Sequence, residues 1–414
     1  MGKLLTSMLG WVDERFPLTA NWKAHLSEYY APKNFNFWYY FGSLAMLVLV
    51  IQLVTGIFLT MSYKPDAGMA FASVEFIMRD VEYGWLIRYM HSTGASMFFV
   101  VVYLHMFRGL MYGSYRKPRE LLWLIGMGIF FCLMGEAFFG YLLPWGQMSY
   151  WGAQVIVNLF GAIPFIGDSL SVWIRGDYSI SDITLNRFFA YHVIALPFVL
   201  VGLGGAHLLA LHEVGSSNPD GIEIKKNKDA NGIPLDGIPF HPYYTVKDIY
   251  GVVGFLIVFS AIMFFAPELG GYFIEYNNFI PANPLQTPEH IAPVWYFTPY
   301  YSILRAVTIN FLWIDAKFWG VVAMGASTAI FCLLPWLDRS PVKSIRYKGP
   351  YFKIALTLFV ISFFVLGWLG TQPVSEIKTL LAQIFTVIYF AFFILMPWYS
   401  KMDKTKPEPA RVTG

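Results

Sequence analysis

The fold is decided by residues 85–112, which read WLIRYMHSTGASMFFVVVYLHMFRGLMY. The stretch is almost entirely apolar, and it is longer than the roughly 20 residues that a helix needs to cross a bilayer. It also carries His91 and His105. Ionisable residues are rare within membrane helices and usually have a function there. The stretch therefore predicts a membrane-spanning helix that takes part in chemistry.

The rest of the sequence has the same character. Of the 414 residues, 57% are hydrophobic and only 13% are charged, whereas soluble proteins usually carry about a quarter charged residues. Lysine plus arginine exceed aspartate plus glutamate by only three residues (29 against 26), so nucleic acid is excluded as a partner. We expect an all-α integral membrane protein with eight transmembrane helices, at roughly 37–62, 85–112, 121–143, 186–211, 248–266, 318–337, 352–370 and 377–398.

Three segments outside these spans differ in composition. Residues 1–34 mix apolar and charged residues at helical spacing, which favours an amphipathic surface helix over a cleaved signal. Prolines and glycines interrupt residues 144–182, which favours short interfacial helices, and the six prolines of 267–317 are typical of a structured outer loop. These boundaries predict a surface segment (1–34), a four-helix bundle with outer interfacial helices (35–215), a cytoplasmic loop (216–247), a C-terminal four-helix membrane region (248–400) and a cytoplasmic tail (401–414).

The distribution of basic residues predicts the orientation. With eight spans, both termini and the loops after the second, fourth and sixth spans share one side of the membrane. That side holds 20 lysines and arginines, and the opposite side holds eight. Because the basic side of a membrane protein is normally cytoplasmic, we expect both termini in the cytoplasm. This topology fits a bacterial plasma membrane, and it leaves a mitochondrial inner membrane open.

Four histidines in two spans indicate the chemistry. His91 and His105 are 14 residues apart in the second span, and His192 and His207 are 15 apart in the fourth. A step of 14 residues is about four helical turns, so His91 and His105 share one face about 21 Å apart. If the two helices face each other antiparallel, His91 pairs with His192 near the outer side and His105 with His207 near the inner side. Two bis-imidazole iron sites would then be stacked across the bilayer.

A different class of protein also uses membrane histidines. A haem-free transporter can carry them as proton relays or as hydrogen-bonded helix contacts. A reduced-minus-oxidised absorption spectrum separates the two classes, because only the protein with two bis-imidazole haem sites shows two low-spin b-type bands.

Glycines repeat the histidine spacing. Gly42 and Gly56 in the first span, and Gly126 and Gly140 in the third, are each 14 residues apart. This pattern favours room for flat macrocycles at two depths, although glycine is also a routine packing residue in membranes. No Cys-x-x-Cys-His motif occurs, so the haem is expected to be bound non-covalently. Arg88 and Arg108, each three residues from a histidine, either pair with haem propionates or extend to the interface.

Seven motifs then give a resemblance over most of the chain. They are GWLIRYMHSTGAS (84–96), HMFRGLMYGSYRKPREL (105–121), GYLLPWGQMSYWGAQV (140–155), NRFFAYH (186–192), HEVGSSNP (212–219), IPFHPYYTVKD (238–248) and YSILRA (301–306). The chain resembles the cytochrome b family of the respiratory cytochrome bc complexes, the ubiquinol–cytochrome c oxidoreductases. The resemblance implies an N-terminal four-helix bundle that holds two b-type haems. His91 and His192 would bind a low-potential outer haem, and His105 and His207 a high-potential inner haem.

Two quinone sites are also implied by the resemblance. Quinone would be reduced at an inner site formed by His212, Ser216 and Asp248. The residue chemistry agrees, since quinone reduction consumes protons and His212 and Asp248 are titratable; both can equally be solvated interface residues. Quinol would be oxidised at an outer site that comprises Phe138, Tyr141, Trp151, Gly152, Val294, Trp295 and Tyr296.

The chain departs from the family pattern at two places. The family's histidine spacing in the fourth helix is often 14, and here it is 15 with Pro197 in between. We expect a local bulge or kink near Pro197 to absorb the extra residue. The outer-loop motif, usually Pro-Glu-Trp-Tyr, contains Val294 in place of the carboxylate that is assigned to quinol deprotonation.

The missing carboxylate needs a substitute. Glu136 is the only acidic residue inside the third span and lies about 10 Å below its outer end, so it is the first candidate for the proton acceptor. A structural hydrogen bond to a neighbouring helix is the alternative for Glu136. Glu289, in the outer loop, is the second candidate.

The resemblance finally implies a function and its partners. Quinol would be oxidised outside, with electrons divided between a Rieske-type iron–sulfur protein, which serves a membrane-anchored c-type cytochrome, and the two haems that lead to quinone reduction inside. This is a proton-translocating Q cycle with ubiquinol and ubiquinone as substrates, in a homodimer embedded in the bilayer. The photosynthetic plastoquinol-oxidising relative is the enzymatic alternative. A single chain with eight spans argues against it, because there the homologous region is usually split into two chains.

Overall fold

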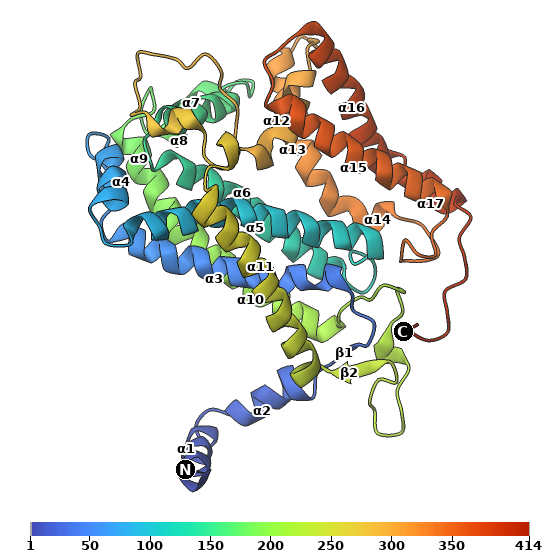
Figure 1. Ribbon diagram of the computed structural model, residues 1–414. Coiled ribbons are helices and arrows are strands. Elements are labelled where there is room, and N and C mark those ends of the chain that lie inside the picture. Colours follow the sequence, from blue (N-terminus) through green and yellow to red (C-terminus); the bar gives the residue numbers. More distant parts are fainter. Residues whose placement is uncertain (1, 414) are drawn as a thin grey trace.

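The computed structural model describes residues 2–413 (Figure 1). Within that part, eight helices are long and apolar enough to cross a membrane: Phe37–Thr60, Gly84–Tyr112, Glu120–Leu142, Asp182–Val214, Phe240–Phe265, Ala316–Leu337, Pro350–Gly370 and Glu376–Ile394. They confirm the eight expected spans and the all-α fold class. Residues 1 and 414, the ends of the expected surface segment and tail, lie outside the described residues.

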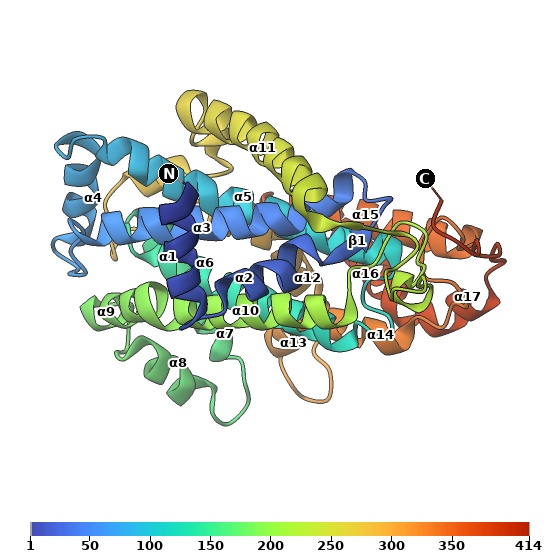
Figure 2. The same cartoon turned by 90° about the horizontal axis from the view of Figure 1, so that it is seen from below.

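Four of the spans form an N-terminal bundle. It consists of α3 (Tyr40–Thr60), α5 (Gly84–Tyr112), α6 (Glu120–Leu142) and α10 (Leu196–Val214), with α3 packed on α5 and α6 on α10 (Figures 1 and 2). Buried side chains on these helices include Val48, Phe98, Val101, Met127, Phe130 and Leu200. The outer surfaces of these helices are apolar too. This is expected where lipid replaces water and a helix satisfies its own backbone groups.

The bundle has two distinct ends. The short helices α4 (Ala70–Arg79), α7 (Gln147–Phe160) and α8 (Gly167–Arg175) lie at one end, which we call the outer end (Figure 1). Helices α7 and α8 are the short helices expected between the third and fourth spans. The other end, called the inner end, carries the C-terminal tail and an antiparallel pair of strands, β1 (Tyr30–Pro32) and β2 (Gly237–Pro239).

The fourth span contains the expected bulge. Helix α9 (Asp182–Ala190) continues into a π-helical turn, Tyr191–Ala195, and then into α10. A π turn holds one residue more than an α turn, so it takes up the extra residue between His192 and His207. The turn ends two residues before Pro197, whose missing N–H group removes one α-helical hydrogen bond at this point.

The C-terminal half packs on the bundle, with its first helix against α3 and α5 and the turn Ile330–Leu333 against α6. It comprises α11 (Thr245–Phe265), α12 (Thr298–Ala306), α13 (Ala316–Ala329), α14 (Leu334–Leu337), α15 (Pro350–Gly370), α16 (Glu376–Ile394) and α17 (Met396–Met402). Helix α12 lies within the segment 267–317 that was expected to be a loop, and it packs on α13, α15 and α16. Its second residue is Pro299, and proline suits the first turn because the N–H group there has no partner in the helix.

Hydrogen bonds join the two halves. The Trp123 indole donates to the carbonyl of Phe331 at 2.8 Å, and the Tyr103 hydroxyl donates to the carbonyl of Tyr296 at 2.6 Å. At the inner end, the Tyr115 hydroxyl donates to Asp338 at 2.7 Å. The segment that carries Tyr296 is thereby held against the bundle.

The chain ends are arranged differently from each other. Helices α1 (Gly2–Asp13) and α2 (Leu18–Trp22) project from the bundle, and α1 leaves Leu5, Met8, Leu9 and Trp11 exposed (Figure 1). The C-terminal tail instead returns to the inner end, where Arg411 donates to both carboxylate oxygens of Asp236 at 2.6 and 3.0 Å.

Candidate functional site

The four membrane histidines form two pairs across the bundle. The ring centroids of His91 and His192 are 6.1 Å apart, and those of His105 and His207 are 6.4 Å apart. The first pair is nearer the outer end and the second nearer the inner end, which is the arrangement that the spacing predicts. Each gap is wide enough for one metal ion with two imidazole nitrogens at about 2 Å.

The four glycines lie against these imidazoles. A Cβ atom added at Gly56 would be 3.3 Å from the His91 ring, and one at Gly42 would be 3.3 Å from the His105 ring. A Cβ atom added at Gly126 would be 3.2 Å from the His207 ring, and one added at Gly140 would overlap the His192 ring. The glycines thus make room for the histidine rings that line the two cavities, and room for flat macrocycles at the same two depths stays a prediction.

The outer histidines are held through their Nδ1 atoms. His91 Nδ1 lies 2.9 Å from the Thr55 hydroxyl, and His192 Nδ1 lies 2.9 Å from the Glu136 carbonyl oxygen and 3.1 Å from the Glu136 carboxylate. Because Nδ1 is engaged, Nε2 is the nitrogen that can bind a metal. Of the inner histidines, His207 has a backbone contact with Leu122, whereas His105 Nδ1 is buried without a hydrogen-bond partner in the described part of the chain.

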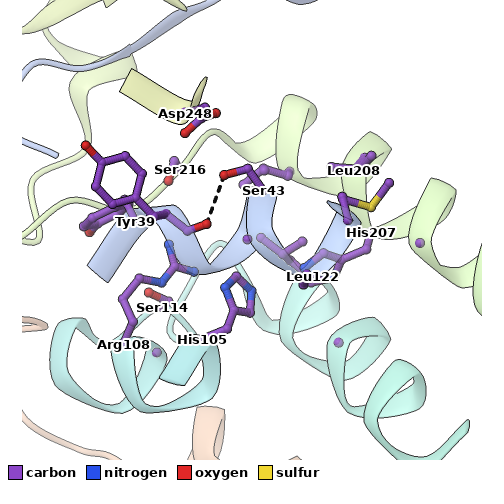
Figure 3. Close-up of a pocket in the computed structure, with 18 of the residues that line it drawn as sticks. Tyr39, Ser43, His105, Arg108, Ser114, Leu122, His207, Leu208, Ser216 and Asp248 are labelled. Carbon is purple, nitrogen blue, oxygen red and sulfur yellow. Dashed lines mark hydrogen bonds between the residues drawn. The ribbon is translucent and has the colours of Figure 1, made fainter. Parts of the chain in front are cut away.

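A cavity accompanies each pair. The inner cavity, of about 690 Å³, is lined by His105, His207, Gly42, Gly126 and Arg108, and also by the expected quinone residues His212, Ser216 and Asp248. In Figure 3, His105 and Arg108 approach this cavity from α5, while Asp248 lies across it. The outer cavity, of about 260 Å³, is lined by His91, His192, Gly56, Gly140, Arg88, Glu136, Tyr141, Val294 and Tyr296. Buried, largely apolar cavities at facing imidazoles fit the haem groups that the sequence predicts.

Residues from the N-terminal segment complete the inner cavity. The His212 ring packs against Tyr29 with centroids 4.6 Å apart and against His25 at 5.0 Å. Both Tyr29 and His25 line the cavity, and the pairing of β1 with β2 brings them there. Arg119 supports the same wall from behind, since it donates to the carbonyl oxygen of Ser216 at 3.3 Å. The composition of residues 1–34 predicts a surface segment, and nothing in it indicates that Tyr29 and His25 line a cavity.

A carboxylate that the sequence does not single out lies behind the wall of the outer cavity. The Tyr141 hydroxyl lines the cavity and donates to Glu275 at 2.5 Å. Burial raises the pKa of Glu275 to about 7. Beside this pair, Val294 and Tyr296 are buried, and the Tyr296 ring stacks on Phe99 at 3.9 Å. Glu275 is one of several acidic residues in the outer loop, and nothing in its local sequence distinguishes it.

Five expected outer residues do not line this cavity among the described residues. The Phe138 ring packs on Phe188 at 5.4 Å, and the Trp151 indole donates to Asn283 at 3.3 Å. Trp295 donates to Ser96 at 3.2 Å, and Glu289 is exposed. Gly152 lies one layer behind, against the ring of Tyr141.

Glu136 lines the outer cavity and contacts a histidine. Its carboxylate is nearest to His192, whereas the cavity-lining Tyr141 hydroxyl is bonded to Glu275. Of the two acidic residues, Glu275 therefore has the direct hydrogen bond to the part of the cavity formed by Tyr141, Val294 and Tyr296.

Comparisons with known proteins cover both halves of the chain. The family model described as "Cytochrome b/b6/petB" matches residues 26–215, and the one described as "Cytochrome b(C-terminal)/b6/petD" matches residues 281–390. The chain is 67% identical to a cytochrome b of Allochromatium vinosum over 99% of both chains. It is 48% identical to a cytochrome b of Rhodospirillum rubrum over 98% of this chain and 96% of the relative. A chain in a solved structure titled "Hyperthermophilic respiratory Complex III" superimposes with a TM-score of 0.86 at 41% identity, covering 95% of this chain and 98% of that one.

Proposed function

The chain belongs to the cytochrome b family of bacterial respiratory complex III, and from this premise we propose how its two cavities divide the reaction. It is the cytochrome b subunit of a quinol–cytochrome c oxidoreductase, a multi-pass membrane protein that works with other subunits of that complex. Membership of the family implies haem. The ligand assignments, the quinone sites and the orientation are proposals.

The observation that carries the proposal is the pair of facing histidines in each cavity. His91 and His192 would hold an outer haem b, and His105 and His207 an inner haem b, both without covalent attachment. When bound, the haems supply one-electron carriers at two depths of the bilayer. Arg88 and Arg108 line the two cavities and can pair with haem propionates. Cation–π contact with Tyr39, 4.9 Å from the Arg108 guanidinium, holds that arginine in place.

The outer cavity is the proposed site of quinol oxidation. Conversion of one quinol to quinone releases two electrons and two protons, so the site must take up protons as the electrons leave. The Tyr141 hydroxyl can accept a quinol proton while it passes its own proton to Glu275, which leaves Tyr141 neutral. A carboxyl with a pKa of about 7 is suited to this role, because it accepts a proton near neutral pH and releases it again. Glu136, which also lines the cavity, is the second candidate for the acceptor.

The inner cavity is the proposed site of quinone reduction. Reduction of quinone to quinol consumes two electrons and two protons. Asp248 and His212 line the cavity and can deliver protons there, and Ser216 can donate a hydrogen bond to a quinone oxygen. The cavity is lined by residues of the inner end of the bundle, such as His25 and His212, and the excess of lysine and arginine would make that end cytoplasmic. Both termini would then be cytoplasmic in a bacterial plasma membrane.

The proposed partners follow from the reaction. A Rieske-type iron–sulfur protein would take one electron from each quinol at the outer end and pass it to a membrane-anchored c-type cytochrome. Two copies of the chain would form a homodimer, and ubiquinol and ubiquinone would be the substrates.

Spectroscopy and turnover of the purified complex test the proposal together. We expect two low-spin b-type bands in the reduced-minus-oxidised spectrum and quinol-dependent reduction of cytochrome c. A preparation with no Soret absorbance would instead support a haem-free transporter. Haem bands without quinol-dependent electron transfer would overturn the assignment of the two quinone sites.

A further inference from the structure

We infer that Glu136 is a positioning residue for His192 and lowers the reduction potential of the outer haem. The inference rests on the proposed function, because it assumes that His192 binds the outer haem. It concerns a carboxylate that lies in contact with a proposed ligand, at the back of the imidazole ring.

The contact has two parts. The Glu136 carbonyl oxygen is 2.9 Å from His192 Nδ1, and the Glu136 carboxylate oxygen Oε1 is 3.1 Å from the same atom. Both can accept the one proton on Nδ1. The other carboxylate oxygen, Oε2, is buried and has no hydrogen-bond partner among the described residues. The Glu136 side chain is only 16% exposed, so little water can reach it in place of a protein partner.

Helix α6 holds this ring from two positions. Glu136 contacts Nδ1, and Gly140, one helical turn later, lies against the Cε1 edge. Glycine lets the ring approach the helix, and Glu136 fixes which nitrogen carries the proton. The π turn that carries His192 positions the ring from the other side. The orientation of His192 is therefore set by α6 and not by its own helix alone.

The four histidines differ in this respect. His91 has a neutral hydroxyl, that of Thr55, near Nδ1, and only His192 has a carboxylate there. His105 Nδ1 has no hydrogen-bond partner within the described residues, and His207 has only a backbone contact, with Leu122. A hydrogen-bond acceptor at Nδ1 makes an imidazole a more basic ligand, and a more basic ligand favours the ferric over the ferrous ion. The effect is strong in a buried site because the local dielectric constant is low.

The consequence is a direction for electron transfer. If the carboxylate at His192 Nδ1 lowers the potential of the outer haem and neither inner histidine has a carboxylate there, electrons move favourably from the outer to the inner haem. Glu136 then contributes to the driving force for electron transfer across the membrane.

Redox titration of both haems in the purified complex tests the inference. In Glu136→Leu, we expect the ferrous-to-ferric ratio of the outer haem to rise roughly tenfold at a fixed ambient potential, which is about 59 mV for a one-electron couple. The inner haem serves as the internal reference and should keep its potential. Glu136→Gln retains a neutral hydrogen-bond acceptor of the same size at this position, so its shift should be smaller, about threefold. Glu120→Gln is the matched control, because it removes a carboxylate from the same helix about 24 Å away along the axis.

The outcomes are distinguishable. An unchanged outer potential in Glu136→Leu, with the haem bound, overturns the inference. If Glu136→Leu does not retain the outer haem, the Gln variant decides, and no shift there overturns the inference as well. Equal shifts of both haems would indicate a general electrostatic effect and would also contradict it. Retention of the outer haem in His192→Leu would instead show that the ligand assignment in the proposed function is wrong.

Discussion

The Tyr141 hydroxyl donates a 2.5 Å hydrogen bond to Glu275, a residue 134 positions further along the chain. The contact exists because the loop after α11 is bonded to the start of α7. Ser149 donates its backbone N–H to Asn278 at 2.8 Å, and Ala282 donates to the carbonyl oxygen of Trp145 at 3.0 Å. These bonds hold Glu275 behind Tyr141 at the wall of the outer cavity.

Substitution of Glu275 by glutamine should slow quinol oxidation by roughly 100-fold or more, the usual cost of losing a general base. Both haems should remain bound. In the wild type, the rate should fall as the pH drops below about 7, because the carboxyl becomes protonated and can no longer accept a proton. The variant should lack this pH limb. Stopped-flow reduction of the outer haem by quinol between pH 5 and 9 measures both effects.

Glu289→Gln is the matched control for this prediction. It removes an exposed carboxylate from the same outer loop, so its rate and pH profile should stay close to those of the wild type. Wild-type kinetics in Glu275→Gln together with strong impairment in Glu136→Gln would restore Glu136 as the proton acceptor.

Loss of single histidines should remove haems by pair. His91→Leu and His192→Leu should each remove the outer haem, and His105→Leu and His207→Leu the inner one, because the centroid distances of 6.1 and 6.4 Å pair the rings in this way. Reduced-minus-oxidised spectra with haem quantification report which band is lost. Loss of the same haem in His91→Leu and His207→Leu would contradict the pairing.

The histidine pairs could be predicted because their geometry is local. Helical periodicity places His91 and His105 on one face, and only the antiparallel contact of two helices remains to be supplied. The bulge near Pro197 is also local, since an extra residue between two fixed positions must be absorbed within that helix. The eight spans follow from composition alone.

The contacts that complete the cavities could not be predicted in the same way. Tyr29 and His25 reach the inner cavity because β1 pairs with β2, yet these strands have three residues each and contain prolines, which leaves no strand signal in the sequence. Glu275 reaches Tyr141, at the wall of the outer cavity, through the path of a long loop, and that path depends on distant hydrogen bonds. The histidine pattern could be predicted because its spacing lies within single helices, whereas these cavity contacts join segments that are far apart in the sequence.

The inner cavity supports a prediction about quinone reduction. Asp248→Asn or His212→Ala should slow reoxidation of the inner haem at least tenfold while reduction of the outer haem by quinol is unchanged, because both side chains line the inner cavity only. Flash-induced haem kinetics separate the two events. Unchanged reoxidation in both variants would place quinone reduction outside this cavity.

The glycine contacts support a comparison within one helix. In Gly140→Ala the new Cβ would come closer than 3.0 Å to the His192 ring, so the outer haem should be lost or bound with a distorted spectrum. Gly128→Ala is the control on the same helix, where the nearest atom is 3.7 Å away. Alanine favours a helix by about 1 kcal/mol over glycine, so the control should be at least as stable as the wild type. Haem content per polypeptide and thermal stability are the measurements. Normal outer haem in Gly140→Ala would show that the ring has room to shift.

The C-terminal tail supports a final prediction about the inner end. Arg411 donates to both carboxylate oxygens of Asp236, whose side chain is fully buried, and Lys33 adds a contact at 3.2 Å. The hydrogen bonds from Arg411 are the main reason why the pKa of Asp236 falls to about 2. Two residues further on, the Thr413 hydroxyl donates to Asp220 at 2.8 Å. The tail thus holds the loop 216–247 at two places, near its start and in its second half, and the first residue of the loop, Ser216, lines the inner cavity.

Arg411→Ala should therefore release the tail at pH 7 and increase its cleavage by a non-specific protease several-fold, because a buried carboxylate loses its bidentate partner. The folded pKa of Asp236 lies below its ordinary value of 3.8, so the stabilisation is complete above pH 3.8 and is lost as the pH falls toward 2. The wild-type tail should accordingly resist cleavage at pH 7 and at pH 5. Lys406→Ala is the control, since residue 406 is anchored by its backbone N–H to the carbonyl oxygen of Tyr347.

If the tail positions the loop, Arg411→Ala should also slow reoxidation of the inner haem without changing its potential. A released tail with wild-type reoxidation would limit the role of this contact to holding the chain end.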